Sequence, residues 1–295
     1  MSGWTLDDLR RIDLKCSEEG VHIHQRPFRA AMELLGANFV MGAGSNPDVK
    51  RIMDAYASMM PKVETSWPGA GIGLVASVDQ VRKTIFPVIF GQNALQPWQI
   101  AGFESGEEWW NWCRQDRMIA AGVALACADI HDLTMGLNEA EQGNADAVTL
   151  WRMAGSNLED AANTLPTAFS HDSVIQPICM VAELSMKAAL VWDGTDPESF
   201  RKGKDGHNLA LLARRMAAAR PHRDDARVQA VVASLPPYVA SRYKPAGLKR
   251  LQVVKLAVGV QFIAASTLRR IAKPDLAHQM EADSDWPGPR PTFSI

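Results

Sequence analysis

The chain contains few cysteines, and their spacing matches no known cysteine motif. Four occur among 295 residues, and no C-x-x-C spacing links any two of them. A zinc site or a disulfide framework needs cysteines in closely spaced sets, and two of these lie within apolar helical stripes. We therefore predict buried free thiols. The four are Cys16, Cys113, Cys127 and Cys179.

The sequence also lacks the long apolar segments that insert a chain into a membrane. No apolar run reaches the ~20 residues that span a bilayer. The first residues, MSGWTLDDLRRIDLKC, lack the apolar centre of a signal peptide. We therefore expect a cytoplasmic protein with no membrane partner. With 47% hydrophobic and 22% charged residues, the chain is typical of soluble globular proteins and long enough for two domains.

Two short motifs resemble cofactor sites but lack the residues that would complete them. Gly42 and Gly44 follow an apolar run, but Pro47 stands where the third glycine of the dinucleotide motif G-x-G-x-x-G belongs. His22 and His24 could share a metal ion on a strand, yet no later His or Asp cluster completes a site. We interpret these as a tight turn and as surface or capping histidines, and we expect no metal and no cofactor.

Charge is distributed unevenly along the chain, although the net charge is only -2. Residues 1–195 carry 14 Lys or Arg against 24 Asp or Glu, whereas residues 196–273 carry 16 against 5. Such a basic block could form a positive surface that attracts phosphate. It could equally neutralise the acidic part of the chain, within one molecule or across a dimer. Charge patterning alone leaves both alternatives open.

The first 136 residues are predicted to form a mostly helical domain of unknown type. Apolar residues spaced three and four apart predict helices over 7–15, 27–36 and 47–60. Ser77 is interpreted as the cap of a further helix over 77–86. The glycine-containing stretch before it, WPGAGIGLVAS, is expected to be a short strand or a loop.

A tryptophan-rich segment near the end of this region has the clearest helical pattern. Ser105 and Glu108 form a capping box, and the apolar spacing predicts one helix of about 27 residues, or ~40 Å. Trp109, Trp110 and Trp112 lie near its start. They could stack bases or bind a partner protein, which makes an interaction scaffold one functional hypothesis. A packing block at a domain interface is the favoured interpretation.

The polar stretch GLNEAEQGN, residues 136–144, is the predicted domain boundary. Four helical stretches within 145–272 each carry one apolar face, which predicts an antiparallel four-helix bundle. Gln261 interrupts the apolar face of the last helix without an identifiable partner. The acidic, proline-containing tail, 274–295, is predicted to be disordered. The expected fold class is therefore all-α or mainly helical.

Short motifs follow one another in order within residues 145–272. A helix carrying E-x-x-x-K-A, in which Glu183 and Lys187 form an i,i+4 pair, precedes a Lys-rich turn and an H-[ND]-L-x-x-L motif that begins at His207. The segment AVTLWRMAGSNLEDAANTL comes before them, and the element SRYKP with a long closing helix comes after them. Together these motifs resemble the HEPN family (higher eukaryotes and prokaryotes nucleotide-binding domain), in which similar elements form the first helix and the closing part. The resemblance covers about 130 residues and implies a helical bundle.

The resemblance implies binding of a nucleotide, RNA or another anionic ligand at the basic start of a helix. The predicted binding face combines Arg201 and His207 with four further cations. These are Lys202, Lys204, Arg242 and Lys244.

The alternative is a metal-independent, homodimeric ribonuclease of the toxin or defence type. HEPN nucleases carry an R-x(4–6)-H motif completed across the dimer, and Arg201 and His207 fit this spacing. In this hypothesis His207 acts as the general acid or base on the ribose 2'-hydroxyl and Arg201 stabilises the phosphate. Asp205 or Asn208 would orient them. Against this, a loop containing Gly203 and Gly206 is expected to hold two catalytic groups loosely.

Overall fold

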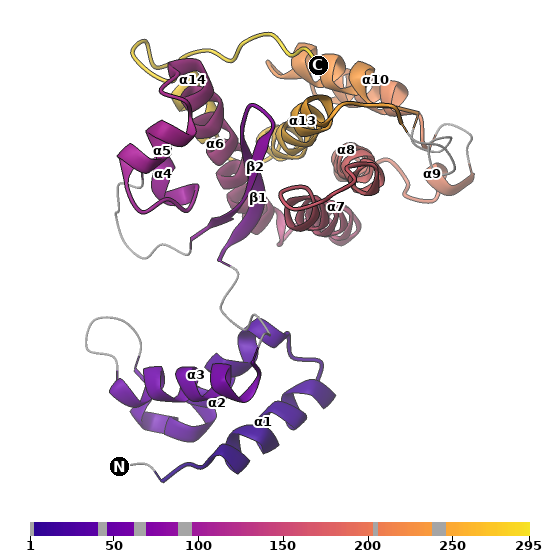
Figure 1. Cartoon of the computed structure of the whole chain (residues 1–295). Helices are drawn as coiled ribbons and strands as arrows, with labels where there is room; N and C mark the ends of the chain where they lie inside the picture. The colour runs from indigo at the N-terminus through magenta and orange to yellow at the C-terminus, as the bar shows by residue number, and fades with distance from the viewer. Residues whose placement is uncertain (1–2, 41–45, 62–68, 88–95, 203–205, 238–245) are drawn as a thin grey trace. The chain divides into compact units, whose positions relative to one another are not determined.

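The computed structural model describes residues 3–40, 46–61, 69–87, 96–202, 206–237 and 246–295. The chain forms two compact units, Met1–Pro68 and Gly69–Ile295 (Figure 1). Both are built mainly of helices, which confirms the predicted fold class. The division falls earlier than the expected boundary at 136–144. That stretch instead holds the end of one helix and the turn to the next, and both helices pack in the second unit.

The first unit consists of three helices around a small apolar core. These are α1 (Leu6–Glu18), α2 (Arg26–Leu35) and α3 (Pro47–Met59), with 3-10 turns η1 (Ile23–Gln25) and η2 (Gly36–Asn38). The three predicted helices are thus confirmed. Leu9, Ile12 and Tyr56 are fully buried in the core. His22 and His24 stack with ring centroids 5.1 Å apart beside η1, so they do not lie on a strand.

The second unit begins with a β-hairpin. Its first strand lies in the stretch expected to be a short strand or a loop, and its second strand lies where a helix was predicted. Strands β1 (Gly71–Ser77) and β2 (Gln80–Phe86) pair antiparallel, with Ser77 opposite Gln80. The helix predicted over 77–86 is therefore wrong. Val81, Thr84 and Phe86 are buried while their neighbours are exposed or half-buried, and Val78 adopts φ 58° in the two-residue turn. Strand-favouring residues and the tight turn decide the local structure here.

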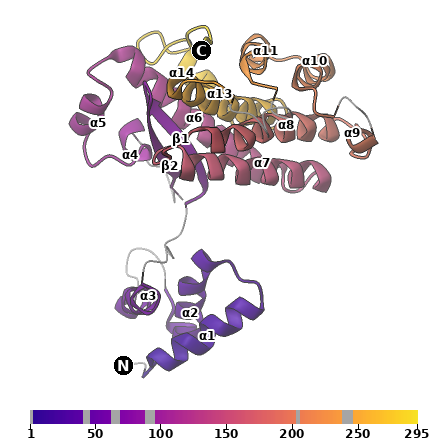
Figure 2. The same ribbon diagram turned by 45° about the vertical axis from the view of Figure 1, so that its right-hand side comes forward.

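Helices of the second unit pack around α8 and α13, as Figures 1 and 2 show. Helix α13 contacts both α6 and α8, α7 lies along α8, and the hairpin lies against α6. The helices are α4 (Pro97–Ile100), α5 (Gly106–Trp112), α6 (Arg117–Ala140), α7 (Ala145–Thr164), α8 (Ile175–Trp192), α9 (Ser199–Lys202), α10 (Leu209–Ala219), α11 (Asp225–Ser234), α13 (Arg250–Arg269) and α14 (Leu276–Glu281), with the 3-10 turn η3 (Asp172–Val174) before α8.

The helices predicted within 145–272 are present, but they do not form a separate bundle. They correspond to α7, α8, α10 and α13. Leu74 from the hairpin and Leu133 from α6 belong to the same hydrophobic core as these helices. The core therefore extends across the predicted boundary.

The tryptophan-rich helix is interrupted. Arg114 and Gln115 adopt φ values of 59° and 55°, and Asp116 caps the N-terminus of α6. The prediction of one continuous helix is wrong because these two residues leave the right-handed helical region between α5 and α6. Trp109 and Trp112 are half-buried against a second apolar core, which lies within the second unit, so they pack as a block there.

The C-terminal tail is ordered against the rest of the unit, so its predicted disorder is wrong. Arg290 forms an ion pair with Asp129 at 2.7 Å and another with Glu281, and its side chain is only 9% exposed. The ring of Trp286 contacts the edge of Trp109. The tail's acidic and proline-rich composition suggested a solvated segment, but an internal ion pair and an aromatic contact hold it in place.

A buried arginine organises the charged residues of the second unit. Arg269 on α13 has no exposed side-chain surface and contacts Asp129 at 2.5 Å, Asp132 at 2.7 Å and Asp224 at 3.4 Å. Burial alone would raise the pKa of Asp224. The hydrogen bond with His222 and the charge of Arg269 outweigh burial, so that this pKa lies below its usual value. Part of the basic block thus neutralises the acidic part within one molecule.

The polar residue on the apolar face of α13 binds the hairpin and α6. Gln261 accepts a hydrogen bond from the backbone N–H of Leu74 at 2.8 Å and donates to the carbonyl oxygens of Leu74 and Ala126. A β-carbon at Gly73 would lie 2.5 Å from the Gln261 Oε1 atom, so glycine allows the strand to approach this closely. Gln261 therefore joins three elements that are distant in sequence.

Among the residues that the structure describes, three helical stretches are long and apolar enough to cross a membrane by length and composition. They are α6, Asp172–Trp192 and α13, and 67% to 83% of their most apolar windows are buried inside the protein. This differs from the expectation that no such segment exists. Packing in the core accounts for their apolar character, and the absence of a membrane partner stays a prediction.

Candidate functional site

An ion pair is buried in the middle of α8, the helix that carries the first predicted motif. The Lys187 ammonium donates to Glu183 Oε1 at 2.6 Å, and the two side chains are 10% and 2% exposed. The sequence spacing predicted this i,i+4 pair. Its burial means that the two charges neutralise each other largely out of contact with water.

The turn before α10 brings His207 back to this pair. Gly206 lies so close to α9 that a β-carbon there would be 2.2 Å from the carbonyl oxygen of Phe200. Asn208 caps α10, with its Oδ1 atom accepting a hydrogen bond from the N–H of Leu211. Gly206 thus allows a close approach to α9 just before His207. The loop expectation also rests on Gly203, which lies outside the described residues.

His207 and Glu183 form a hydrogen-bonded pair at the end of this turn. Nδ1 of His207 lies 3.1 Å from Oε2 and 3.2 Å from Oε1 of the Glu183 carboxylate. The imidazole side chain is 57% exposed, whereas the carboxylate is buried. Because a carboxylate accepts hydrogen bonds, Nδ1 carries the proton and Nε2 is an acceptor in the neutral ring. A histidine oriented in this way can take part in proton transfer.

The ring of Phe200 lies close to two cations, one of which is Lys187 of the buried ion pair. Phe200 on α9 is 8% exposed, and its ring centre lies 5.4 Å from the Lys187 ammonium and 5.7 Å from the Arg215 guanidinium carbon. Arg215 lies on the exposed side of α10. No carboxylate in the described part of the chain forms an ion pair with it. Phe200 therefore lies beside at least one cation, Arg215, that no ion pair neutralises within the described residues.

The structure describes some of the predicted site residues, and it adds others. His207 and Asn208 are described, and Arg201 and Lys202 form the end of α9. Four predicted residues lie outside the described ranges, namely Lys204, Asp205, Arg242 and Lys244.

Three residues that the sequence prediction did not assign to the site lie in this region, and with His207 they form what we call the His207 site. Glu183 binds Nδ1 of His207, and Lys187 binds Glu183. Arg215 lies beside the Phe200 ring, as Lys187 does. Two charged residues in an otherwise apolar helix were the available signal for the first two. Nothing in the spacing linked them to His207, which lies 24 residues after Glu183. Asn208, which was expected to orient the catalytic groups, caps a helix, and Glu183 holds the imidazole.

The nearby thiol is not suited to nucleophilic chemistry. Burial, followed by the Glu183 charge, raises the pKa of Cys179 to about 12, so the thiol stays protonated near neutral pH. All four cysteines are buried and free, as predicted. Within the described ranges, no group of three or more His, Cys, Asp or Glu side chains could hold a metal ion. The arrangement can therefore supply an imidazole and cations as its reactive and binding groups.

Comparison with known proteins gives no family for this chain. The resemblance to the HEPN family therefore rests on the four sequence motifs alone. No protein-family model, curated protein or solved structure matches the chain.

Proposed function

We propose that the second unit binds the phosphate group of a nucleotide or of RNA at His207. The observation that supports this most directly is the exposed imidazole fixed at Nδ1 by the buried Glu183 carboxylate. A fixed, exposed imidazole can donate a hydrogen bond to a phosphate oxygen when it is protonated.

The charges around His207 favour an anion. Lys187 neutralises Glu183 at 2.6 Å, so the carboxylate does not leave a net negative charge behind the imidazole. Arg215 and Lys187 both lie beside the Phe200 ring, so Arg215 adds a positive charge to this region. The sequence RKGK, which begins at Arg201, contains three more cations, whose side chains lie outside the described residues. Phosphate binding by such a set is electrostatic to a large extent, so its affinity falls as salt is added.

Binding of labelled RNA to the wild type is expected to weaken steeply between about 50 and 200 mM salt. His207→Ala and Arg215→Ala are each expected to weaken it by about tenfold, because each removes one donor to phosphate. Fluorescence anisotropy with a short RNA and with nucleotides would measure this.

Matched controls for these variants lie in the same unit. Arg214→Ala removes an exposed cation next to Arg215 on α10, and His278→Ala removes an exposed imidazole on α14. Both should bind like the wild type. If the controls lose as much affinity as His207→Ala and Arg215→Ala, binding depends on overall charge and the proposed site is wrong. Absence of binding at low salt to RNA and to nucleotides would contradict the proposal altogether.

A second candidate function, metal-independent RNA cleavage, is favoured by the Glu183–His207 hydrogen bond. A carboxylate that holds one ring nitrogen is a common arrangement for a general acid or base. His207 would take the proton of a ribose 2'-hydroxyl as its oxygen attacks phosphorus. The bond from phosphorus to the 5'-oxygen would break, and the 5'-oxygen would take a proton from solvent and leave as a hydroxyl, which yields a 2',3'-cyclic phosphate. In this hypothesis Arg201 stabilises the phosphate, and the site is completed across a homodimer.

If the protein is a nuclease, it should cleave a mixed RNA pool in EDTA, and His207→Ala should slow cleavage by about 100-fold or more. Glu183→Gln keeps the shape but replaces the carboxylate that accepts the hydrogen bond from Nδ1, so it should also shift the pH profile. Gel analysis of RNA ends would detect the cyclic phosphate. Cleavage by wild type and His207→Ala at equal rates would exclude His207 as the catalytic group. Intact RNA in both would exclude cleavage and leave the binding role.

A further inference from the structure

A partly open cavity of about 520 Å³ lies in the second unit, apart from the His207 site. Its walls come from the hairpin, α6, α11, α13 and the C-terminal tail, and it shares no residue with the His207 site. This volume falls in the range of sites that hold small organic molecules. The cavity therefore has the size of a ligand site.

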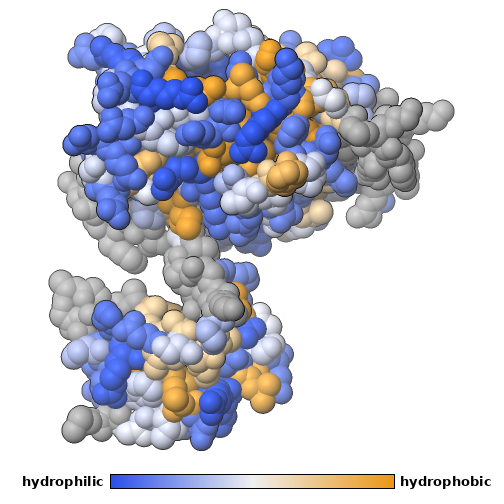
Figure 3. All heavy atoms as spheres, in the orientation of Figure 1, coloured by the Kyte–Doolittle hydropathy of each residue, from blue (hydrophilic) through white to orange (hydrophobic). Residues whose placement is uncertain are grey.

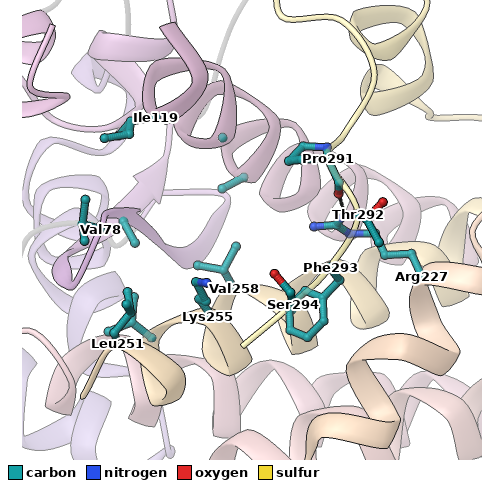
Figure 4. Close-up of a pocket in the computed structure, with 15 residues that line it drawn as sticks. Val78, Ile119, Arg227, Leu251, Lys255, Val258, Pro291, Thr292, Phe293 and Ser294 are labelled. Atoms are coloured by element: carbon teal, nitrogen blue, oxygen red, sulfur yellow. Dashed lines mark hydrogen bonds between the residues drawn. The ribbon is translucent and has the colours of Figure 1, made fainter. Parts of the chain in front are cut away.

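Most of the cavity wall is apolar. Val78 at the hairpin turn, Ile119 on α6, and Leu251 and Val258 on α13 line it and are half-buried or exposed, as Figure 4 shows. Figure 3 shows hydrophobic surface reaching the solvent on the face of the unit that carries the hairpin and α13. Apolar side chains that remain in contact with water favour an apolar ligand.

Gly122 on α6 leaves open space in this wall. A methyl group there would meet no heavy atom within 4 Å, and the residue lines the cavity. Glycine inside a helix is less favourable than alanine by about 1 kcal/mol, so helix stability does not explain a glycine at position 122. The missing side chain enlarges the cavity where a ligand could lie along α6.

Two cations give the cavity a positive charge. In the described part of the chain, neither Arg227 nor Lys255 forms an ion pair. Arg227 donates one hydrogen bond to the carbonyl oxygen of Pro291 at 2.6 Å, but its buried Nε–H has no partner within those residues (Figure 4). Its guanidinium carbon lies 5.2 Å from the ring centre of Phe262 and 5.7 Å from that of Phe293. Burial and the charge of Arg290 lower the pKa of Arg227, so an anion nearby would stabilise its charged form.

We propose that this cavity binds a small anionic amphiphile, with its apolar body along α6 and α13 and its carboxylate or phosphate beside Arg227 and Lys255. The apolar wall would contact the apolar body of the ligand, and Arg227 and Lys255 would bind its anionic head group. The proposal does not depend on the function of His207, because the two sites have no residue in common.

Calorimetric titration of the full chain would test the proposal with three probes that share a ten-carbon chain. Decanoate and decyl phosphate carry the two candidate head groups, and decanol is their neutral match. At least one anionic probe should bind with a Kd of roughly 0.1 mM, below its micelle concentration, given the usual affinity per ligand atom. Decanol should bind at least about tenfold more weakly. Comparison of the two anions identifies the preferred head group.

Variants separate the apolar wall from the charges. Gly122→Leu fills the open space and should weaken binding by about tenfold or more without loss of thermal stability. Its matched control is Gly155→Leu on α7, where a methyl group also meets no atom within 4 Å but which does not line the cavity. Lys255→Met should weaken the anionic probes and leave decanol unchanged. Equal binding by Gly122→Leu and the wild type, equal binding of decanol and the anions, or no binding of any probe would overturn the proposal.

Discussion

Replacing Arg269 with methionine is expected to lower the free energy of unfolding by about 3–5 kcal/mol. The guanidinium has no exposed surface and contacts Asp129, Asp132 and Asp224. Methionine fills a similar volume but leaves buried carboxylates without their main cation. An uncompensated buried charge costs several kcal/mol, so the loss exceeds that of an ordinary surface substitution.

Urea unfolding of the full chain, followed by circular dichroism, would measure the effect. Arg152→Met is the matched control, because Arg152 is 61% exposed and its ion pair with Glu141 should contribute about 1 kcal/mol or less. Adding Asp129→Asn to Arg269→Met removes one of the uncompensated charges and should reduce the penalty. If Arg269→Met lowers the free energy of unfolding no more than Arg152→Met does, the ion pairs of Arg269 do not stabilise the second unit.

Gln261→Leu is expected to destabilise the protein by about 2–4 kcal/mol. Leucine is close to glutamine in size, so packing changes little. The N–H of Leu74 and the carbonyl oxygens of Leu74 and Ala126 lose their side-chain partner. A buried backbone group without a partner costs about 1–3 kcal/mol, and strand β1 would lose part of its attachment to α13.

Hydrogen exchange would locate this effect in the structure. The amide of Leu74 should exchange faster in Gln261→Leu, whereas amides in α1 to α3 should not change. Gln229→Leu on α11 provides a control at an exposed helical position. If Gln261→Leu and Gln229→Leu lower the free energy of unfolding by the same amount, the hydrogen bonds of Gln261 do not stabilise the protein.

Local patterns predicted the helices better than the rest of the fold. Helices such as α3 and α8 have caps, proline starts or apolar stripes that depend on nearby residues. The second strand of the hairpin was mistaken for a helix because Ser77 resembles a cap, and the pairing of Ser77 with Gln80 has no separate signal in the sequence. The interruption at Arg114 depends on a backbone conformation that neither residue type nor spacing indicates.

The candidate site was found only in part, for a similar reason. The motif identified His207, and the spacing identified Glu183 and Lys187 as a pair. Their contact depends on a turn in which Gly206 packs on the carbonyl of Phe200, and this is a tertiary feature. Gln261 is a comparable case, because it was recognised as an exception but its partners lie 135 and 187 residues earlier.

The long separation of the buried charge partners also affects how the chain can fold during synthesis. Asp129 and Asp132 leave the ribosome well before their cations, since Arg269 follows 140 residues after Asp129 and Arg290 follows 161 residues after it. Helix α6 can form early, but its carboxylates must stay hydrated until α13 and the tail arrive. Contacts of such high sequence separation slow folding. The second unit therefore reaches its native core late, and a nascent chain that ends before residue 269 exposes apolar faces that chaperones recognise.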